Sequence, residues 1–252
     1  MEKYFSINQK NMSVKCKIYC ENPRAVERVV LSGHGFGGHK DNRAAEKLYN
    51  RLQKRNKNIA LITFNWPGHG DDASPQLRLE GCDRYLTAVL DYIRTELHTE
   101  DIYGSANSFG GYLFLKYIYE HGSPFVKTVL RSPAVNIYQS LRERIMNAGE
   151  LEEIEKGRTA LVGFDRKIRV SAEFLNDLKE ADITTRDFSP FADDIFIIHG
   201  DRDEIIDCEA SWMFAEENGV GFYIEEGADH RYTDPLKMDD AIKQTVQFFG
   251  LR

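Results

Sequence analysis

The chain has 252 residues, of which 42% are hydrophobic and 12% aromatic, enough for one packed α/β domain. Lys and Arg number 33 against 40 Asp and Glu, so the formal net charge is −7 and no basic stripe favours a nucleic-acid partner. No run approaches the roughly 18 apolar residues of a membrane span, and the start MEKYFSINQK lacks the apolar core of a signal peptide. These features predict a cytoplasmic protein with no membrane partner, either a monomer or a homodimer.

Alternating and fully apolar runs predict strands, and apolar residues at helical spacing between them predict helices. The predicted strands are 3–8, 13–20, 28–32, 59–64, 102–106, 126–130, 195–198 and 220–224. The predicted helices are 41–55, a long one that carries Tyr85 to Leu97, 109–120, 207–218 and 236–249. This alternation indicates an α/β fold with a mostly parallel, doubly wound sheet, whose ligand crevice lies at the carboxyl ends of the strands.

Residues 135–192 interrupt the alternation after the sixth strand. They hold a charged helix-like stretch near 141–155, a possible hairpin around Asp165-Arg166 and a helix-like run at 172–179. A structureless loop of that length is improbable, so we interpret the segment as a small inserted cap or lid. The core domain would then comprise residues 1–134 and 193–252.

The four cysteines fit a reducing compartment. Cys16 and Cys20 lie on one face of a predicted strand about 13 Å apart, too far for a disulfide. Cys82 and Cys208 fall in helical patterns, and we expect both to be small buried hydrophobic side chains.

Ser108 lies between a predicted strand and a predicted helix, in the sequence Ala106-Asn107-Ser108-Phe109-Gly110. Small residues two positions before and two after let a serine sit on a sharp turn with its hydroxyl exposed. A nucleophilic serine needs a base and a carboxylate that orients the base. His230 follows the last strand and Asp203 follows the strand before it, which completes the order Ser108, Asp203, His230.

Other residues near these positions have simpler interpretations. Asp201 is the alternative acid, but we favour Asp203 because it lies further round the loop toward His230. We interpret Asp229 as a turn former and His199 as structural. The remaining histidines show no metal-ligand spacing, so no metal is expected.

The glycine-rich loop Gly33-His34-Gly35-Phe36-Gly37-Gly38 has two interpretations. Its glycine spacing fits a dinucleotide fingerprint, yet the next strand ends in Phe64-Asn65 and offers no acid for a ribose. We therefore favour an oxyanion hole made by the backbone N–H groups of Phe36 and Phe109, with no cofactor. His34, Gly35 and Gly110 would support this loop.

These motifs together resemble the α/β-hydrolases over nearly the whole chain apart from the insertion. Within that fold the chain most resembles small intracellular carboxylesterases, in the cinnamoyl/feruloyl-esterase-like and monoacylglycerol-lipase-like branch. The resemblance implies an ester substrate partly covered by residues 135–192. Asn107 departs from it, because relatives usually carry histidine before the serine, and so do Asp71-Asp72, which replace a small residue.

The expected activity is hydrolysis of a small-molecule carboxylic ester through an acyl-enzyme on Ser108. Amide or peptide hydrolysis and acyl transfer are alternatives on the same triad, and a non-catalytic ligand-binding protein is an alternative from another class. Candidate substrate contacts are Asn107, Trp66, Tyr138, Phe164 and Phe174. Trp66 could instead pack within its loop, and the aromatic residues of the insertion could form its own core.

Overall fold

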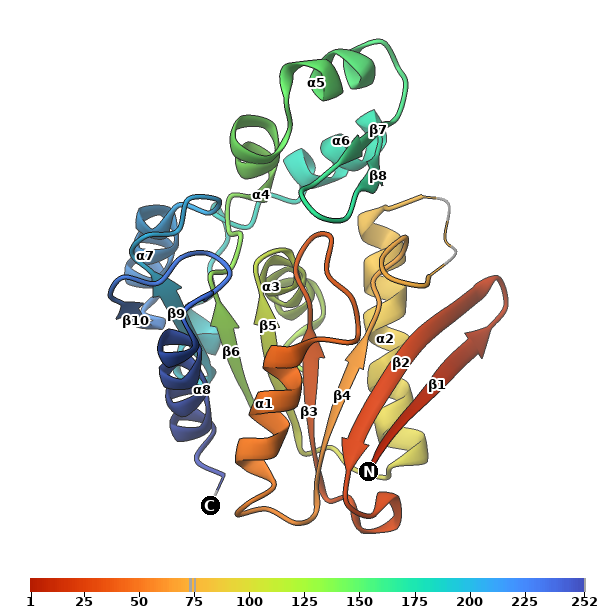
Figure 1. Ribbon diagram of the computed structural model, residues 1–252, viewed down its shortest axis with the longest axis vertical. Coiled ribbons are helices and arrows are strands. Elements are labelled where there is room, and N and C mark those ends of the chain that lie inside the picture. The colour runs from red at the N-terminus through yellow and green to blue at the C-terminus, as the bar shows by residue number, and fades with distance from the viewer. Residues whose placement is uncertain (73, 75, 252) are drawn as a thin grey trace.

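The computed structural model describes residues 1–72, 74 and 76–251, which fold around an eight-stranded sheet (Figure 1). The strand order is β1-β2-β4-β3-β5-β6-β9-β10. The strands are β1 (Glu2–Gln9), β2 (Met12–Cys20), β3 (Arg28–Gly33), β4 (Ile59–Phe64), β5 (Ile102–Asn107), β6 (Lys127–Arg131), β9 (Ile195–Gly200) and β10 (Gly221–Glu225).

In this sheet β4, β3, β5, β6, β9 and β10 run parallel to one another, whereas β2 pairs antiparallel with both β1 and β4. β4 and the middle of β3 are apolar runs because helices cover both sides of the sheet. All six residues of β4 are buried, and Val29, Val30 and Leu31 of β3 have no exposed surface. The predicted doubly wound, mostly parallel sheet is confirmed.

Helices cover both faces of the sheet. One face packs against α1 (Arg43–Leu52) and α8 (Pro235–Phe249), the other against α2 (Leu79–Glu96), α3 (Phe109–His121) and α7 (Cys208–Asn218). A short helix, η1 (Pro23–Ala25), precedes β3. The structure differs from the prediction at α1, which begins at Arg43 because the side chain of Asn42 caps the amide of Ala44.

The four cysteines are free, and Cys16, Cys20 and Cys82 are buried as expected. Cys208 is only half-buried, because it is the first residue of α7 and lies at the edge of the packed core. No helix within the described ranges is long and apolar enough to cross a membrane.

Between β6 and β9 the chain forms a separate group of short elements beyond the carboxyl ends of the central strands (Figure 1). They are α4 (Ile137–Ser140), the π-helical turn η2 (Leu141–Ile145), α5 (Ala148–Glu155), β7 (Ala160–Val162), β8 (Ile168–Val170), α6 (Ala172–Glu180) and η3 (Ser189–Asp194). The stretch near 141–155 is not one helix, because Asn147 begins α5 with a capping box completed by Glu150.

Hydrogen bonds in and just after α6 help to attach this inserted segment to the core. Arg78, just before α2, donates two hydrogen bonds to Asp177, at 2.6 and 2.7 Å. The hydroxyl of Tyr112 in α3 donates to the carbonyl of Ala181 at 2.9 Å. The start of β1 and the end of α8 lie at the opposite end of the molecule (Figure 1).

Candidate active site

Ser108 occupies a strained turn between β5 and α3, with φ 52° and ψ −122°. Residues other than glycine rarely adopt a positive φ, so the surrounding packing must hold the turn. Gly110 explains part of this, since a Cβ there would lie 2.6 Å from the carbonyl oxygen of His34 and 2.7 Å from that of Gly33. The small residue lets α3 approach the end of β3, which fixes the position of Ser108.

Ser108, His230 and Asp203 are brought together by a chain of hydrogen bonds. The Oγ of Ser108 lies 3.1 Å from Nε2 of His230, and Nδ1 of His230 lies 2.7 Å from Oδ2 of Asp203. A carboxylate accepts a proton, so Nδ1 carries the hydrogen and Nε2 presents its lone pair to the serine hydroxyl. The imidazole is therefore oriented to act as a base toward Ser108.

Asp203 has no exposed side-chain surface and accepts four hydrogen bonds. Its Oδ1 accepts from the amides of Ile205 and Ile206, and its Oδ2 accepts from His199 Nε2 at 3.0 Å as well as from His230. Burial alone would raise the pKa of Asp203, but the hydrogen bonds outweigh it and hold that pKa well below its usual range. Asp203 is therefore ionised at neutral pH.

The neighbouring acids have different partners. Asp201 accepts a hydrogen bond from the amide of Gly227 at 2.5 Å, and Asp229 accepts one from the amide of Thr233 at 2.9 Å. Neither carboxylate contacts His230 in these hydrogen bonds, so the acid beside the imidazole is Asp203.

The candidate oxyanion donors, the amides of Phe36 and Phe109, belong to the glycine-rich loop and to the start of α3, next to Ser108. Phe109 is the first residue of α3, so its amide has no acceptor within that helix. Phe36 follows β3, and its ring packs edge-on against that of Phe109 with centroids 5.9 Å apart. A Cβ on Gly35 would lie 3.1 Å from that of Ser108, so this loop closely approaches the serine.

His34 and Trp66 brace this loop from inside the protein. Nδ1 of His34 donates to the carbonyl of Gly35 at 2.8 Å, and Nε2 accepts from the amide of Trp66 at 3.3 Å. Trp66 Nε1 in turn donates to the carbonyl of His34 at 2.9 Å. Burial lowers the pKa of His34 to about 3, so the imidazole is neutral and supports the backbone as a fixed tautomer.

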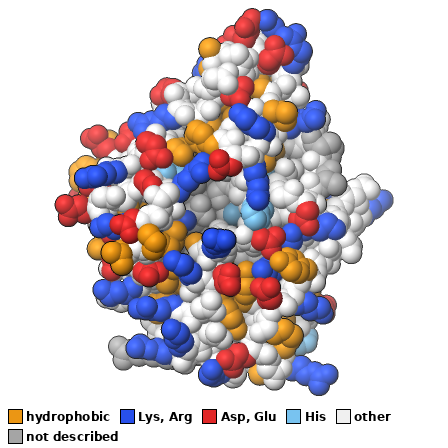
Figure 2. All heavy atoms as spheres, viewed as in Figure 1, with side chains coloured by type: hydrophobic (Ala, Val, Ile, Leu, Met, Phe, Trp, Pro, Cys, Tyr) orange, Lys and Arg blue, Asp and Glu red, His pale blue; other side chains and the backbone are white. Residues whose placement is uncertain are grey.

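A cavity of about 370 Å³ opens above Ser108 and His230. Its walls are the glycine-rich loop 34–39, the start of α1, the tip of the β7–β8 hairpin and the residues Asn107, Arg131, Ile145, Ile205 and Arg231. Figure 2 shows a hollow near the middle of this face, with Lys, Arg and His side chains around it. Of the predicted substrate contacts, Asn107 and Phe164 line the cavity.

Three predicted substrate contacts do not line this cavity. Trp66 and Phe174 have no exposed surface: Trp66 braces the glycine-rich loop, and Phe174 packs edge-on against Phe109 with centroids 6.0 Å apart. Tyr138 is half-buried, and its hydroxyl accepts from Arg142 at 3.1 Å. These aromatic side chains therefore belong to the loop packing and to the core of the inserted segment, the alternative noted from the sequence.

The charged walls of the cavity were missed in the sequence. Arg43, Arg131, Arg166 and Arg231 all line it, as do Asp41 and Asp165. Arg131 offered one signal, because it is the last residue of the buried strand β6 and so lies at the sheet edge where Ser108 lies.

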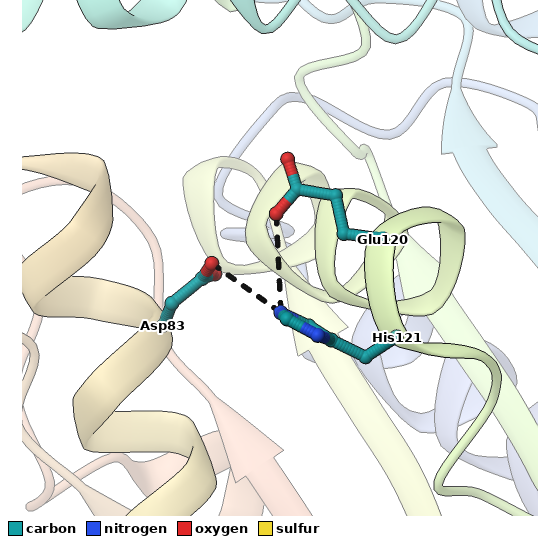
Figure 3. Close-up of side chains that lie close together, drawn as sticks. All are labelled: Asp83, Glu120 and His121. Carbon is teal, nitrogen blue, oxygen red and sulfur yellow. Dashed lines mark ion pairs between the residues drawn. The ribbon is translucent and has the colours of Figure 1, made fainter.

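Across the described ranges one group of side chains has atoms close enough to hold a metal ion, Asp83, Glu120 and His121 (Figure 3). They lie on α2 and α3, and none of them lines the cavity. Lys116 already lies among them, with Nζ 3.0 Å from Asp83 and 2.5 Å from Glu120. The Lys116 ammonium pairs with both carboxylates, so the group forms an ion-pair network between the two helices.

The parallel sheet, the strained serine turn after β5 and the hydrogen-bonded histidine after β10 define an α/β hydrolase. The family described as serine aminopeptidase, S33, matches residues 24–153, and the chain belongs to it. It is therefore a hydrolase of the α/β serine hydrolase class. No curated protein matches the chain significantly.

Solved structures with the same fold cover nearly the whole chain. Est1E from Butyrivibrio proteoclasticus, solved with ferulic acid bound, has a TM-score of 0.72 at 19% identity, covering 98% of this chain and 99% of its own. A putative hydrolase from Agrobacterium vitis S4 has a TM-score of 0.74 at 16% identity, with coverage of 99% and 98%. Paleococcus ferrophilus monoacylglycerol lipase has a TM-score of 0.65 at 17% identity, covering 96% of this chain and 100% of its own.

Proposed function

We propose that the protein is a serine carboxylesterase that uses Ser108, His230 and Asp203 as its catalytic triad. The observation that carries the proposal is the continuous set of hydrogen bonds from Ser108 Oγ through His230 to Asp203, at 3.1 and 2.7 Å. This arrangement supplies a nucleophile, a base with a fixed tautomer and a buried carboxylate, which acyl transfer requires.

In the first half of the reaction His230 Nε2 takes the proton of Ser108 as Oγ attacks the ester carbonyl carbon. The negative charge that forms on the carbonyl oxygen is stabilised by the amides of Phe36 and Phe109, each worth roughly 3–4 kcal/mol in a typical oxyanion hole. His230 then protonates the departing alcohol oxygen as its bond to the acyl carbon breaks. The acyl group remains on Ser108.

In the second half water replaces the alcohol. His230 takes a proton from the water as its oxygen attacks the acyl carbon, and then returns that proton to Ser108 Oγ as the acyl–oxygen bond breaks. Asp203 stays ionised throughout and holds the imidazolium that forms in each half. The acid is released and the enzyme is restored.

The cavity favours an ester over the amino-terminal amide that an aminopeptidase cleaves. An aminopeptidase must bind a substrate ammonium, for which an unpaired carboxylate is the suitable partner. Here Asp165 pairs with Arg231 at 2.7 Å, while Lys17 and Lys40 lie within 3.6 Å of Asp41. The ferulic acid complex of Est1E and the named lipase are consistent with the ester assignment.

The inserted segment would act as a cap that partly covers the substrate. The tip of its hairpin, from Gly163 to Arg166, forms one wall of the cavity above Ser108. We propose residues 135–192 as this cap, with residues 1–134 and 193–252 as the catalytic core.

The test is hydrolysis of p-nitrophenyl acetate by the wild type and by Ser108→Ala, together with labelling by a fluorophosphonate probe. We expect the wild type to hydrolyse the ester and to be labelled on Ser108, and the variant to do neither. Equal hydrolysis by both proteins would show that Ser108 is not the nucleophile. Absence of both hydrolysis and labelling in the wild type would instead favour a ligand-binding protein.

Two further substrates separate the alternatives on the same triad. An aminoacyl p-nitroanilide reports amide cleavage, and we expect it to be turned over far more slowly than the ester. Adding methanol to the ester reaction reports acyl transfer. A methyl ester as the main product at low methanol concentration would identify an acyltransferase.

A further inference from the structure

The cavity above Ser108 carries excess positive charge in a protein whose formal net charge is −7. Four arginines line it against two aspartates. Asp165 pairs with Arg231, and Asp41 lies within 3.6 Å of Lys17 and Lys40, which make shorter contacts with Glu2 and Asp71. Over the described part of the chain, Arg43, Arg131 and Arg166 form no ion pair. A water-filled cleft of one sign concentrates ligands of the opposite sign.

Arg131 is the most unusual of these side chains because it is half-buried without a carboxylate. Its Nη1 lies 2.8 Å from the sulfur of Met238, and its guanidinium lies over the ring of Tyr232 at 4.9 Å from the centroid. Its Nε is buried and has no hydrogen-bond partner among the described residues. A guanidinium does not lose its proton in proteins, and buried ones are normally paired with an anion.

Arg131 also lies next to the nucleophile in the sheet. It is the register partner of Asn107 in the β5–β6 pair, and its carbonyl accepts a hydrogen bond from the amide of Ser108 at 3.1 Å. Its side chain borders both the main cavity and a recess of about 40 Å³ between the sheet, α1 and α8. Asn42, Asn107 and Arg131 border both spaces, so they mark the place where the two meet.

The recess adds a second feature that favours an anion. Ala44 and Ala45, in the first turn of α1, line it, and this end of a helix carries the positive pole of the helix dipole. Its walls include the hydroxyl-bearing residues Ser32 and Ser105 among apolar ones such as Leu48, Val129 and Ile242, whereas the Thr245 hydroxyl donates to the carbonyl of Ala241. A volume of about 40 Å³ exceeds what one water needs and suits a small group with two or three oxygens.

We propose that Arg131, Asn42 and the start of α1 bind an anionic group of the substrate, a carboxylate or a phosphate carried a few atoms from the ester bond. This inference rests on the proposed esterase function and names its substrate class: esters of which one half is negatively charged. The substrate anion supplies the partner that Arg131 lacks in the protein. Arg43 at the rim of the cavity adds to the attraction.

The test compares esters that differ only in charge. The ethyl half-ester of glutarate carries a carboxylate, and its half-amide analogue, ethyl glutaramate, is uncharged and nearly the same shape. A third ester carries a phosphonate in place of the carboxylate. We expect the wild type to show a kcat/KM about tenfold or more higher for a charged ester than for the amide, the value of one charge-assisted hydrogen bond.

The variants assign this preference to Arg131. Arg131→Met should lower the ratio of charged to uncharged kcat/KM toward one, and Arg131→Lys should keep part of it. Arg55→Met removes an exposed arginine just beyond the C-terminal end of α1 and should change neither rate. Whichever of the two charged esters has the higher kcat/KM shows whether the site prefers a carboxylate or a phosphate, and either result supports the proposal.

The inference is overturned if the wild type prefers the uncharged ester, or if Arg131→Met slows both esters equally. Turnover of the uncharged ester reports the esterase function separately from the ratio. If no ester is cleaved, the anion site can still be tested by measuring the affinity of glutaramate, which carries a carboxylate, with calorimetry. Arg131→Met must weaken this binding, and equal affinity would overturn the inference.

Discussion

His199 and His230 donate hydrogen bonds to the same oxygen of Asp203, at 3.0 and 2.7 Å. The carboxylate is thus held between two imidazoles, and only His230 contacts Ser108. Nδ1 of His199 is buried and has no partner among the residues that the structure describes, so the ring has Asp203 as its only polar contact there. His199 is therefore a positioning residue for the acid.

Replacing His199 by leucine should reduce both stability and turnover. A hydrogen bond to a charged group contributes about 1.5–3 kcal/mol, so we expect a fall of that size in the free energy of unfolding in urea. We also expect kcat to fall about tenfold as Asp203 loses its fixed position. His199→Gln, which can still donate, should recover part of both losses, and His121→Gln, at an exposed site, should change neither.

Replacing Asp203 by asparagine should lower kcat by about 10⁴-fold, because the amide cannot hold the reactive tautomer of His230. The neighbouring Asp201→Asn is the matched control, and we expect it to stay close to the wild type in rate. If Asp201→Asn lowered kcat more than Asp203→Asn did, the assignment of Asp203 as the acid would be wrong.

The same carboxylate gives a pH dependence of stability. Its pKa is lower in the folded protein than its usual 3.8, so the stabilisation is present above pH 3.8 and is lost as pH falls toward the folded pKa. We expect the difference in unfolding free energy between the wild type and Asp203→Asn to be constant from pH 5 to 7 and to shrink in stronger acid. Urea unfolding at a series of pH values measures it.

His69 should make the protein less stable as pH falls below 6.5. Burial lowers its pKa from 6.5 to about 4, so the unfolded chain binds a proton that the folded protein does not. Between pH 6.5 and about 4, His69 should lower the free energy of unfolding by about 1.4 kcal/mol for each unit that the pH falls. His69→Phe keeps a ring against Phe109 and should make the dependence shallower by that amount. An unchanged slope would show that His69 does not titrate on unfolding.

Gly110 and Gly81 are helical glycines with opposite surroundings. A Cβ at Gly110 would collide with backbone oxygens at 2.6 and 2.7 Å, whereas at Gly81 the nearest atom is Pro67 Cγ at 3.4 Å. We expect Gly110→Ala to destabilise the protein by about 1–3 kcal/mol and to lower kcat, because α3 and Ser108 must move. Gly81→Ala should be neutral or stabilising by up to about 1 kcal/mol. Thermal unfolding and ester hydrolysis distinguish the pair.

The sheet could be predicted from the sequence because its strands are apolar runs that end in glycine or polar loops. The run 59–64, for example, is β4 at the predicted residues, since a fully buried parallel strand needs no alternation of polar side chains. Residues 141–155 were less predictable, because the break before α5 depends on the capping box of Asn147 rather than on hydrophobic spacing.

The site was predictable where the motif fixes the backbone and unpredictable where packing decides. Ser108, Asp203 and His230 each follow a strand, so parallel topology alone brings them to one edge. Whether an aromatic side chain faces a ligand or the core depends on its neighbours: Trp66 is buried against His34, and Phe164 lies at the cavity. The unpaired state of Arg131 also cannot be derived from the sequence, because it depends on which carboxylates lie nearby in the fold.

The start of β1 and the end of α8 both lie at the far end of the molecule from the inserted segment (Figure 1). A tether, an affinity tag or a fused protein at either end would therefore project away from the cavity mouth. The protein can be fixed to a surface through either terminus with its cavity away from the point of attachment, which suits it to immobilised assays with bulky esters.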